Sequence, residues 1–328
     1  MESTMMRSLQ IPTLIIICVV VMMFVHNQSL VSKTELDTLD AKIGHASLEP
    51  KVQYSLEYDP NCELCKSRSK KKVHIVTTFF HMALMKGTAK LLLPNSDWGD
   101  KVKIDKREAK SMFQKRDREL LDVLQMNLMN PCVMAVHIVY NNEKVVEHIM
   151  SQKLRFTDKL IFHLVANPTY QHIMLYIGKY LRHQLVVFAN QDIYLGRGWN
   201  DLNHDLIEER RIMYALTRHG KRERYCRMPD NCAHSQPYLG SHDAFAFILT
   251  EMPNPKHFAL LNHRGDQFGV ENILIFVFNI KLGYEVINPC FVLFVYHVHC
   301  SRIFSNHRVR VNRFNNTGMA HFMDQLYV

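Results

Sequence analysis

One short stretch constrains the fold more than any other: the apolar run Leu185–Ala189 leads directly into Asn190-Gln191-Asp192. A short apolar run with β-branched residues is typical of a strand buried on both faces of a parallel sheet. Ligands of open α/β sheets bind where such strands end. Asn190 and Asp192 are two residues apart, so they would point to the same side of an extended chain. An amide and a carboxylate placed together suit a hard divalent cation and its phosphates, although polar turns also follow strands without any ligand.

Strands and helices alternate around this stretch. Apolar and β-branched runs predict strands at 73–80, 132–140, 159–165 and 185–189, and apolar stripes predict helices at 106–128 and 169–181. Such alternation implies βαβ units with right-handed crossovers. The sequence therefore predicts an α/β fold of Rossmann type, in which a mostly parallel sheet is flanked by helices.

The second half of the chain continues the pattern. A strand is expected at 212–217, and Ser241-His242-Asp243 with the residues after it indicates a loop. Gly269-Val270-Glu271-Asn272 is expected to open a helix that runs to Leu282, with Asn272 as a good N-cap and Gly283 as the stop. A last strand is expected at 290–300.

Two histidines lie on one face of this last strand. His297 and His299 are two residues apart, so their side chains point to the same side. They stand at the polar end of an apolar strand, as Asp192 does. We therefore expect the Asp192 carboxylate and one of the imidazoles to face one crevice, within reach of a single metal ion. Each histidine alone is equally consistent with an ordinary hydrogen-bonded side chain.

The N-terminal part has a different composition. An uncharged apolar run occupies 11–25, between a polar segment at 1–10 and a polar stretch at 26–72 that ends in a basic cluster. As a helix the run would span about 22–25 Å, which suits a thin membrane. No clear cleavage site follows, so we expect a cytoplasmic tail at 1–10, a transmembrane signal-anchor at 11–25 and a lumenal stem at 26–72. A cleaved signal peptide is the alternative. Glycosylation sequons at Asn27 and Asn315 agree with a lumenal location.

Charge and cysteines narrow the choice of partners. A formal charge of +9 favours anionic partners such as nucleotides, phosphates or sulfated glycans. No nucleic-acid-binding signature accompanies it, so we expect no nucleic-acid partner.

The eight cysteines include one C-x-x-C, at Cys62 and Cys65, and indicate disulfides in an oxidising lumen rather than a zinc ribbon. Cys226 and Cys232 would close a small loop, but the sequence does not determine the connectivity.

Four elements, in their order along the chain, resemble motifs of the GT-A-fold glycosyltransferases. Asn190-Gln191-Asp192 stands where that family has Asp-x-Asp. Three more follow: Gly269-Val270-Glu271-Asn272 resembles the Gly-x-Glu-Asp element, Gly283-Tyr284-Glu285-Val286 the Gly-Tyr-x-Val, and Tyr296-His297-Val298-His299 the C-terminal metal-binding histidine. The resemblance covers 73–304. It implies a GT-A-like fold, with one catalytic domain at 73–310 and a C-terminal tail at 311–328.

The resemblance implies a metal centre and a donor substrate. Asp192 would hold a divalent metal, usually manganese, that bridges the diphosphate of a nucleotide sugar. His299, or His297 on the same face, would complete the ligands. Asn190 replaces the first carboxylate of the family's motif, which puts the strength of metal binding in doubt.

The resemblance also implies catalytic residues. Glu271 matches the carboxylate that serves as base in inverting members, and Asp243 lies in the acceptor or donor region. Glycosyl transfer needs a Lewis acid for the leaving diphosphate and a base for the acceptor hydroxyl, so one metal-directed and one separate carboxylate suit it. Glu271 is also explained by its place at a helix N-terminus, where its charge is favoured. Trp199 is a candidate for stacking on a sugar, although core packing is the more common role.

Two functions from different classes remain open. The first is a metal-dependent glycosyltransferase that moves a sugar from a nucleotide-sugar donor to a glycan or glycoprotein hydroxyl. It would be held in a Golgi or other secretory-pathway membrane with its catalytic domain in the lumen. The second is a catalytically weakened relative that binds glycans or protein partners, for which Asn190 is the main support. A sulfotransferase is a weaker third idea, because the segment after the first strand holds only Gly87 for a phosphate-binding loop.

Overall fold

The computed structural model describes residues 72–80, 106–220, 230–233, 236–237, 242–252, 254–265, 267–301, 310–312 and 315–326. These residues belong to one compact unit, Asp59–Val328. The expected tail at 1–10, the anchor at 11–25 and all but the last residue of the stem at 26–72 lie outside the described residues.

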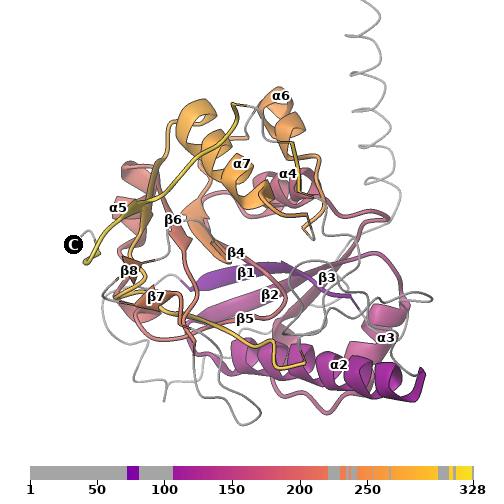
Figure 1. The fold of residues 1–328 in the computed structure, drawn as a ribbon. Coiled ribbons are helices and arrows are strands. Elements are labelled where there is room, and N and C mark those ends of the chain that lie inside the picture. The colour runs from indigo at the N-terminus through magenta and orange to yellow at the C-terminus, as the bar shows by residue number, and fades with distance from the viewer. Residues whose placement is uncertain are drawn as a thin grey trace, which may run out of the picture. The chain divides into compact units, whose positions relative to one another are not determined.

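A mixed sheet of eight strands forms the centre of this unit (Figure 1). Its strand order is β12-β10-β6-β9-β4-β1-β2-β3. The strands are β1 (Val73–Thr78), β2 (Val133–Tyr140), β3 (Leu160–Leu164), β4 (Leu185–Ala189), β6 (Ile212–Leu216), β9 (Ala244–Ile248), β10 (Glu285–Asn288) and β12 (His321–Phe322). Neighbouring strands run parallel except where β9 pairs with β4 and β6. The predicted α/β fold with a mostly parallel sheet is confirmed.

Helices cover both faces of the sheet. In Figure 1, α2 (Lys106–Met129) and α3 (Lys144–Ser151) lie on one side, and α4 (Tyr170–Tyr180), α6 (Pro255–Phe258) and α7 (Val270–Phe276) lie on the other. The remaining helical elements are α5 (His204–Glu209), 3-10 turns at Thr157–Lys159, Trp199–Asp201 and Ala259–Leu261, and a π-helical turn at Val277–Lys281 that extends α7. Two small antiparallel pairs complete the described elements: β5 (Ile193–Leu195) with β11 (Val295–His297), and β7 (Cys232–Ala233) with β8 (Gln236–Pro237).

Strand β4 shows how the two faces of the sheet are used. Its five side chains are all buried. Leu185, Val187 and Ala189 join the core that includes α2, whereas Val186 and Phe188 join the core that includes α4 and α7. The uninterrupted apolar run is therefore explained by two cores, one on each face of the sheet.

Strand β9 was predicted as a loop. Its sequence alternates Ala and Phe, and every residue of it is buried between β4 and β6. The polar residues before Ala244 mark only the point where the chain enters this strand, so the part of the predicted loop that follows Asp243 was wrong.

Two further predicted boundaries are corrected. Helix α7 begins at Val270, and its N-cap is Gly269, with a φ of +86°, rather than Asn272, which lies buried inside the helix. There its Nδ2 donates to the carbonyl of Gly318 at 3.3 Å. The last strand is confined to β11, because the backbone N of Val292 and that of Leu293 both donate to the carbonyl of Pro289 and close a turn.

The predicted localisation in a Golgi or other secretory-pathway membrane needs correction. Within the residues that the structure describes, no helix combines the length and the apolar character needed to cross a bilayer. The run at 11–25, on which the anchor prediction rested, lies outside those residues.

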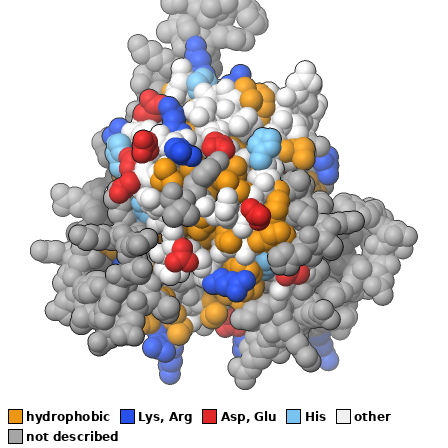
Figure 2. All heavy atoms as spheres, turned by 90° about the vertical axis from the view of Figure 1, so that its left-hand side faces the viewer, with side chains coloured by type: hydrophobic (Ala, Val, Ile, Leu, Met, Phe, Trp, Pro, Cys, Tyr) orange, Lys and Arg blue, Asp and Glu red, His pale blue; other side chains and the backbone are white. Residues whose placement is uncertain are grey.

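Charges are mixed on the face drawn in Figure 2, which is the left-hand side of Figure 1. Acidic, basic and hydrophobic side chains are interspersed there among the described residues. The formal charge of +9 is therefore not gathered into one basic patch on the described part of this face.

Candidate functional site

Several strands end at one edge of the sheet. The parallel strands β1, β4 and β6 end there, and the antiparallel β9 begins there. From β1 the chain passes to β2 and β3, and it returns as β4 on the other side of β1, so β1 and β4 form a topological switch point. Gln191, after β4, is linked here to Phe80, after β1: its Oε1 accepts a hydrogen bond from the backbone N of Phe80 at 3.0 Å.

Asp192 and the two predicted histidines are brought together at this edge. Strand β5 follows Asp192 and pairs with β11, and the backbone N of Val298 donates to the carbonyl of Asp192 at 2.9 Å. As a result, Oδ2 of Asp192 lies 3.1 Å from Nε2 of His297 and 3.6 Å from Nδ1 of His299. The candidate ligand atoms of the three residues all lie within 4.8 Å of one another. The expected juxtaposition is therefore present, and metal binding by it stays a prediction.

A buried arginine, which sequence reasoning missed, also contacts Asp192. Nη2 of Arg116, on α2, donates to Asp192 Oδ2 at 2.5 Å, and its Nη1 donates to the carbonyl of Val298 at 2.8 Å. The same Nη1 lies 3.1 Å from Oε2 of Glu119, one turn along α2. Glu119 in turn accepts bonds from the backbone N and the hydroxyl of Ser301, at 2.6 Å and 2.8 Å. One face of α2 thus holds both the Asp192 segment and the histidine segment.

These contacts determine the charge of Asp192. Burial alone would raise the pKa of this carboxyl group, but His297 and Arg116 outweigh burial and hold the pKa well below its usual range. Asp192 is therefore an anion at neutral pH, although it is 8% exposed. An ionised carboxylate is the form that a cation requires.

The three residues fit a divalent metal ion in kind and spacing. One carboxylate and two imidazoles form a ligand set used by Zn²⁺ and other first-row metals. Two ligand atoms about 2.1 Å from a tetrahedral ion lie roughly 3.4 Å apart, which is close to the two distances from Asp192 Oδ2, 3.1 Å and 3.6 Å. The Arg116 guanidinium donates a hydrogen bond to the same oxygen. Carboxylates that bind metals in proteins commonly accept such bonds from residues that are not ligands themselves.

Asn190 turns away from this group. Its Nδ2 donates to Oδ1 of Asp243 at 3.3 Å, and its backbone N donates to the carbonyl of Asp243 at 3.0 Å. Arg218, a second residue that sequence reasoning missed, donates from Nη1 to the same Oδ1 at 3.0 Å. Asn190 and Asp192 therefore serve two different clusters, and the prediction that they point the same way toward one ion is not met for Asn190.

Glu271 lies at the start of α7. Its Oε2 accepts a hydrogen bond from the backbone N of Gly269 at 2.9 Å, so the carboxylate caps its own helix. Glu271 and Asp243 both act on Tyr170: burial first, and then these two negative charges, raise the pKa of the fully enclosed Tyr170 hydroxyl far above its usual value. Tyr170, Asp243 and Glu271 therefore share one neighbourhood on the α4 and α7 side of the sheet.

Two buried polar groups in the residues before β9 lack hydrogen-bond partners among the described residues. Both ring nitrogens of His242 and Oδ2 of Asp243 are in this position, and the two side chains are 3% and 5% exposed. Burial lowers the pKa of His242 to about 4, so its ring is neutral at pH 7. Buried polar groups are normally hydrogen-bonded, so these atoms are candidates for contact with a polar ligand.

Trp199 has a structural role. The indole is 2% exposed, and its Nε1 donates to the carbonyl of Phe294 at 2.9 Å. The residue packs in the core with the segment that leads into β11. The alternative of core packing, rather than stacking on a sugar, is the one that the structure supports.

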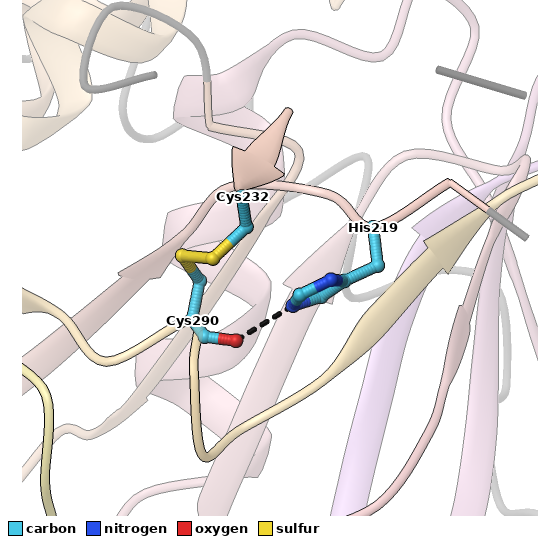
Figure 3. A group of neighbouring side chains, drawn as sticks. All are labelled: His219, Cys232 and Cys290. Atoms are coloured by element: carbon cyan, nitrogen blue, oxygen red, sulfur yellow. Dashed lines mark hydrogen bonds between the residues drawn. A yellow bond between two sulfur atoms is a disulfide. The ribbon is translucent and has the colours of Figure 1, made fainter. Parts of the chain in front are cut away.

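A second cluster of ligand-type residues, His219, Cys232 and Cys290, is a disulfide with a histidine packed beside it (Figure 3). Cys232 pairs with Cys290 rather than with Cys226, the partner that would have closed a small loop. His219 Nε2 bonds the carbonyl of Cys290 at 2.6 Å, and its Nδ1 lies 3.2 Å from Asp230 Oδ2. Metals bind thiolates rather than disulfide sulfurs, so this cluster is not a metal site. It links the residues after β6 to the residues after β10.

The signal for the missed residues lay in the apolar stripe of α2. Arg116 follows Phe113 by three residues and precedes Leu120 by four, so it falls on the face that packs on the sheet. Glu119 is equally buried, with its side chain 3% exposed. Charged residues on a core-facing stripe need buried partners, and that requirement predicts an ionic network.

No protein-family model matches the chain, and no curated protein matches it in sequence. Among solved structures, the chain is similar to HddC from Yersinia pseudotuberculosis, with 11% identity, a TM-score of 0.30, and coverage of 69% of this chain and 93% of that one. It is similar to 4-diphosphocytidyl-2C-methyl-D-erythritol synthase from Anaerococcus prevotii, with 12% identity, a TM-score of 0.29 and coverage of 66% and 87%. It is also similar to the inositol-1-phosphate CTP transferase from T. maritima, with 7% identity, a TM-score of 0.32 and coverage of 70% and 90%. Likeness at these TM-scores carries no conclusion about the reaction of this chain.

Proposed function

We propose that the protein is a glycosyltransferase that moves a sugar from a nucleotide-sugar donor to the hydroxyl of a glycan or glycoprotein acceptor. One observation carries the proposal: Asp192 converges with His297 and His299 at the switch-point edge of the sheet, across 105 residues of sequence. This edge is where open α/β sheets bind nucleotides. The resemblance of the motifs around Asp192, Glu271 and His299 to those of GT-A-fold glycosyltransferases supports the same reading.

Asp192, His297 and His299 would hold a divalent ion, with Mn²⁺ as our choice. When bound, such an ion would supply Lewis-acid stabilisation of the leaving diphosphate. The chain fixes the ligands beforehand: the β5–β11 pairing sets the distance between them, and Arg116 orients the Asp192 carboxylate. Fixed ligands avoid the cost of ordering the site when substrate binds.

Glu271 is our candidate for the base. In the proposed reaction its carboxylate accepts the proton of the acceptor hydroxyl, the hydroxyl oxygen bonds to the anomeric carbon, and the bond from that carbon to the diphosphate oxygen breaks. Glu271 belongs to neither of the candidate ligand groups found among the described residues, so the proposal assigns it no metal to hold. Its bond to Gly269 N holds one carboxylate oxygen and orients the side chain.

Asp243 and Arg218 are our candidates for binding the sugar. The Asp243 Oδ2 atom, which has no hydrogen-bond partner among the described residues, would accept a bond from a sugar hydroxyl. Oδ1 is already held by Asn190 and Arg218, so the carboxylate cannot rotate freely. We expect this pair to act in donor or acceptor recognition rather than in proton transfer.

A second function is favoured by one specific observation. The oxygen of Asp192 that faces both histidines already accepts a hydrogen bond from Arg116, so a permanent positive charge is present at the site without any metal ion. A relative that binds nucleotide or glycan without turnover would carry such a site. Donor turnover separates the two functions, because a binding module would retain nucleotide and release no product.

The test is a panel of nucleotide sugars incubated with the purified chain, with Mn²⁺ or with EDTA. We expect one donor to be hydrolysed slowly with Mn²⁺ and to lose this turnover with EDTA. Saturable binding of the nucleoside diphosphate without hydrolysis or transfer of any donor would favour the binding module. Absence of both binding and turnover would overturn both proposals.

A further inference from the structure

We infer that Arg116 sets the metal affinity of the Asp192 site, so that a divalent ion binds weakly alone and strongly together with a nucleoside diphosphate. The inference rests on the proposed function, because it assigns the ion to Asp192 and its two histidines. It goes further by naming the residue that makes the site select an ion–diphosphate complex over the free ion.

The first support is that Arg116 and both histidines meet at one atom. Arg116 Nη2 donates to Asp192 Oδ2, the oxygen that also faces His297 Nε2 and His299 Nδ1. An arginine side chain stays protonated in proteins. An ion bound through this oxygen would therefore share it with a fixed positive charge.

The second support is that Arg116 has no room to withdraw. It is 3% exposed, and its Nη1 is held by the carbonyl of Val298 and by Glu119. Swinging the guanidinium away would remove a donor from the Val298 carbonyl and take the buried cation away from Glu119 and Asp192. Such unpaired buried groups are costly, so Arg116 stays beside the ion rather than yielding to it.

The third support is the sum of charges. Asp192 and Glu119 carry one negative charge each and Arg116 carries one positive charge, while histidines bind metals as neutral rings. The buried network therefore has a net charge of −1, too little to neutralise a divalent ion. Repulsion between buried charges is poorly screened by solvent. A diphosphate supplies the missing negative charge, so the ion and the diphosphate should each strengthen the binding of the other by the same factor.

A purely orienting role for Arg116 predicts the opposite result. If Arg116 only held Asp192 in place, its removal would weaken metal binding, as loss of such partners usually does by about 10–100-fold. If its charge limits affinity, its removal strengthens the binding of the free ion. The direction of the change therefore decides between the two roles.

The wild-type chain gives the first test. Free Mn²⁺ is measured by electron paramagnetic resonance during titration of the protein, alone and with saturating UDP, GDP or CDP. We expect at least one of these diphosphates to tighten Mn²⁺ binding by tenfold or more. Equal Mn²⁺ affinity with and without every diphosphate would overturn the inference and leave the proposed metal centre standing. No Mn²⁺ binding under any condition would overturn the metal centre itself.

The second test replaces the charge. Arg116→Gln keeps a donor for Asp192 but removes the positive charge, and Arg116→Lys keeps the charge. We expect Arg116→Gln to bind Mn²⁺ alone at least tenfold more tightly than wild type and to lose most of the coupling to diphosphate, whereas Arg116→Lys stays within about threefold. The matched control is Arg118→Gln, an exposed arginine on the same helix, which should change neither quantity.

Folding is checked separately, because Arg116→Gln leaves Glu119 with less compensation. Circular dichroism at the titration temperature identifies unfolded variants, and the double variant Arg116→Gln/Glu119→Gln restores the net charge of −1 without a guanidinium. If the single variant does not fold, the double variant decides: Mn²⁺ affinity within about threefold of wild type supports the role of net charge, and a loss of about tenfold or more supports a purely orienting role. A folded Arg116→Gln protein that binds Mn²⁺ no more tightly than wild type would overturn the inference.

Discussion

Glu119 on α2 bonds Ser301 twice: Oε1 accepts from the backbone N at 2.6 Å, and Oε2 accepts from the hydroxyl at 2.8 Å. The two residues are 182 positions apart, and Ser301 lies two residues beyond His299. Because Glu119 also pairs with Arg116, this one carboxylate connects α2 to the segment that carries the histidines. The position of the candidate ligands therefore depends on a buried side chain that is not itself a ligand.

We predict that Glu119→Gln lowers the free energy of unfolding by about 3 kcal/mol. Breaking a buried ion pair typically costs about 3–5 kcal/mol. The loss should fall at the low end of this range, because Asp192 still pairs with Arg116 and the glutamine oxygen retains one acceptor for Ser301. Urea unfolding followed by circular dichroism measures the change. Asp122→Asn, one turn further along α2 and exposed, is the control and should change stability by less than about 0.5 kcal/mol. Equal stability of the two variants would show that the Glu119 network does not hold the structure.

We predict that the protein loses stability as pH falls below about 6.5. Burial lowers the pKa of His74 to about 4, and burial followed by the charges of His74 and His163 lowers that of His137 to about 3. Between about pH 6.5 and pH 3, the unfolded chain binds protons that the folded chain rejects, so stability rises with pH in this window. Each histidine contributes a slope of about 1.4 kcal/mol per pH unit where only the unfolded chain is protonated.

The histidine dependence has a matched test. His74 and His137 bond each other at 3.0 Å, and His137 bonds the Tyr176 hydroxyl at 2.7 Å. In His137→Gln, the unfolding free energy between pH 6.5 and pH 5 should fall less steeply with acid than in wild type. A wild-type stability that is flat across this range would contradict the prediction.

We predict that the Cys232–Cys290 disulfide contributes about 2–4 kcal/mol. It closes a loop with a sequence separation of 58, and constraining a loop of that length in the unfolded chain has an effect of this size. Cys232→Ser, Cys290→Ser and the double variant should lose the same amount, because each removes the same bond. Additive losses in the double variant would show that the two cysteines act independently, and mass spectrometry of a non-reduced digest checks the pairing directly.

Much of the fold was predictable because the spacing of apolar residues along the sequence reflects which side chains are buried. The apolar run of β4 predicted a strand with two buried faces, and Thr169 with its following residues predicted α4, which it caps by accepting from His172 N at 3.4 Å. Strand β9 was not predictable in the same way. Its direction between β4 and β6 depends on pairing with segments distant in sequence, which local patterns do not record.

The candidate site was predictable where polar residues end apolar strands. Asp192, His297 and His299 met that condition and lie together. Arg116 and Glu119 did not, because a charged residue inside a helix is usually exposed, and only tertiary packing of α2 buries these two. Asn190 was misjudged for a different reason: the strand ends at Ala189, so the extended-chain rule that aligned it with Asp192 no longer applies.

The last prediction separates proton transfer from donor binding through two variants. Glu271→Gln keeps the shape of the side chain and the acceptor for Gly269 N, but removes the basicity. If Glu271 is the base, transfer should fall by roughly 10²–10⁴-fold, while the affinity for donor changes by less than about threefold.

His299→Gln, which alters a candidate ligand with a side chain only 10% exposed, should instead weaken Mn²⁺-dependent donor binding first. Asp192→Asn should do the same, but it leaves Arg116 without its carboxylate, so its fold must be checked by circular dichroism before its binding is interpreted. Donor affinity is measured by isothermal titration with Mn²⁺, and transfer by product release. Transfer by Glu271→Gln at the wild-type rate would remove Glu271 as the base and leave a retaining mechanism or another carboxylate, with Asp243 the first to test.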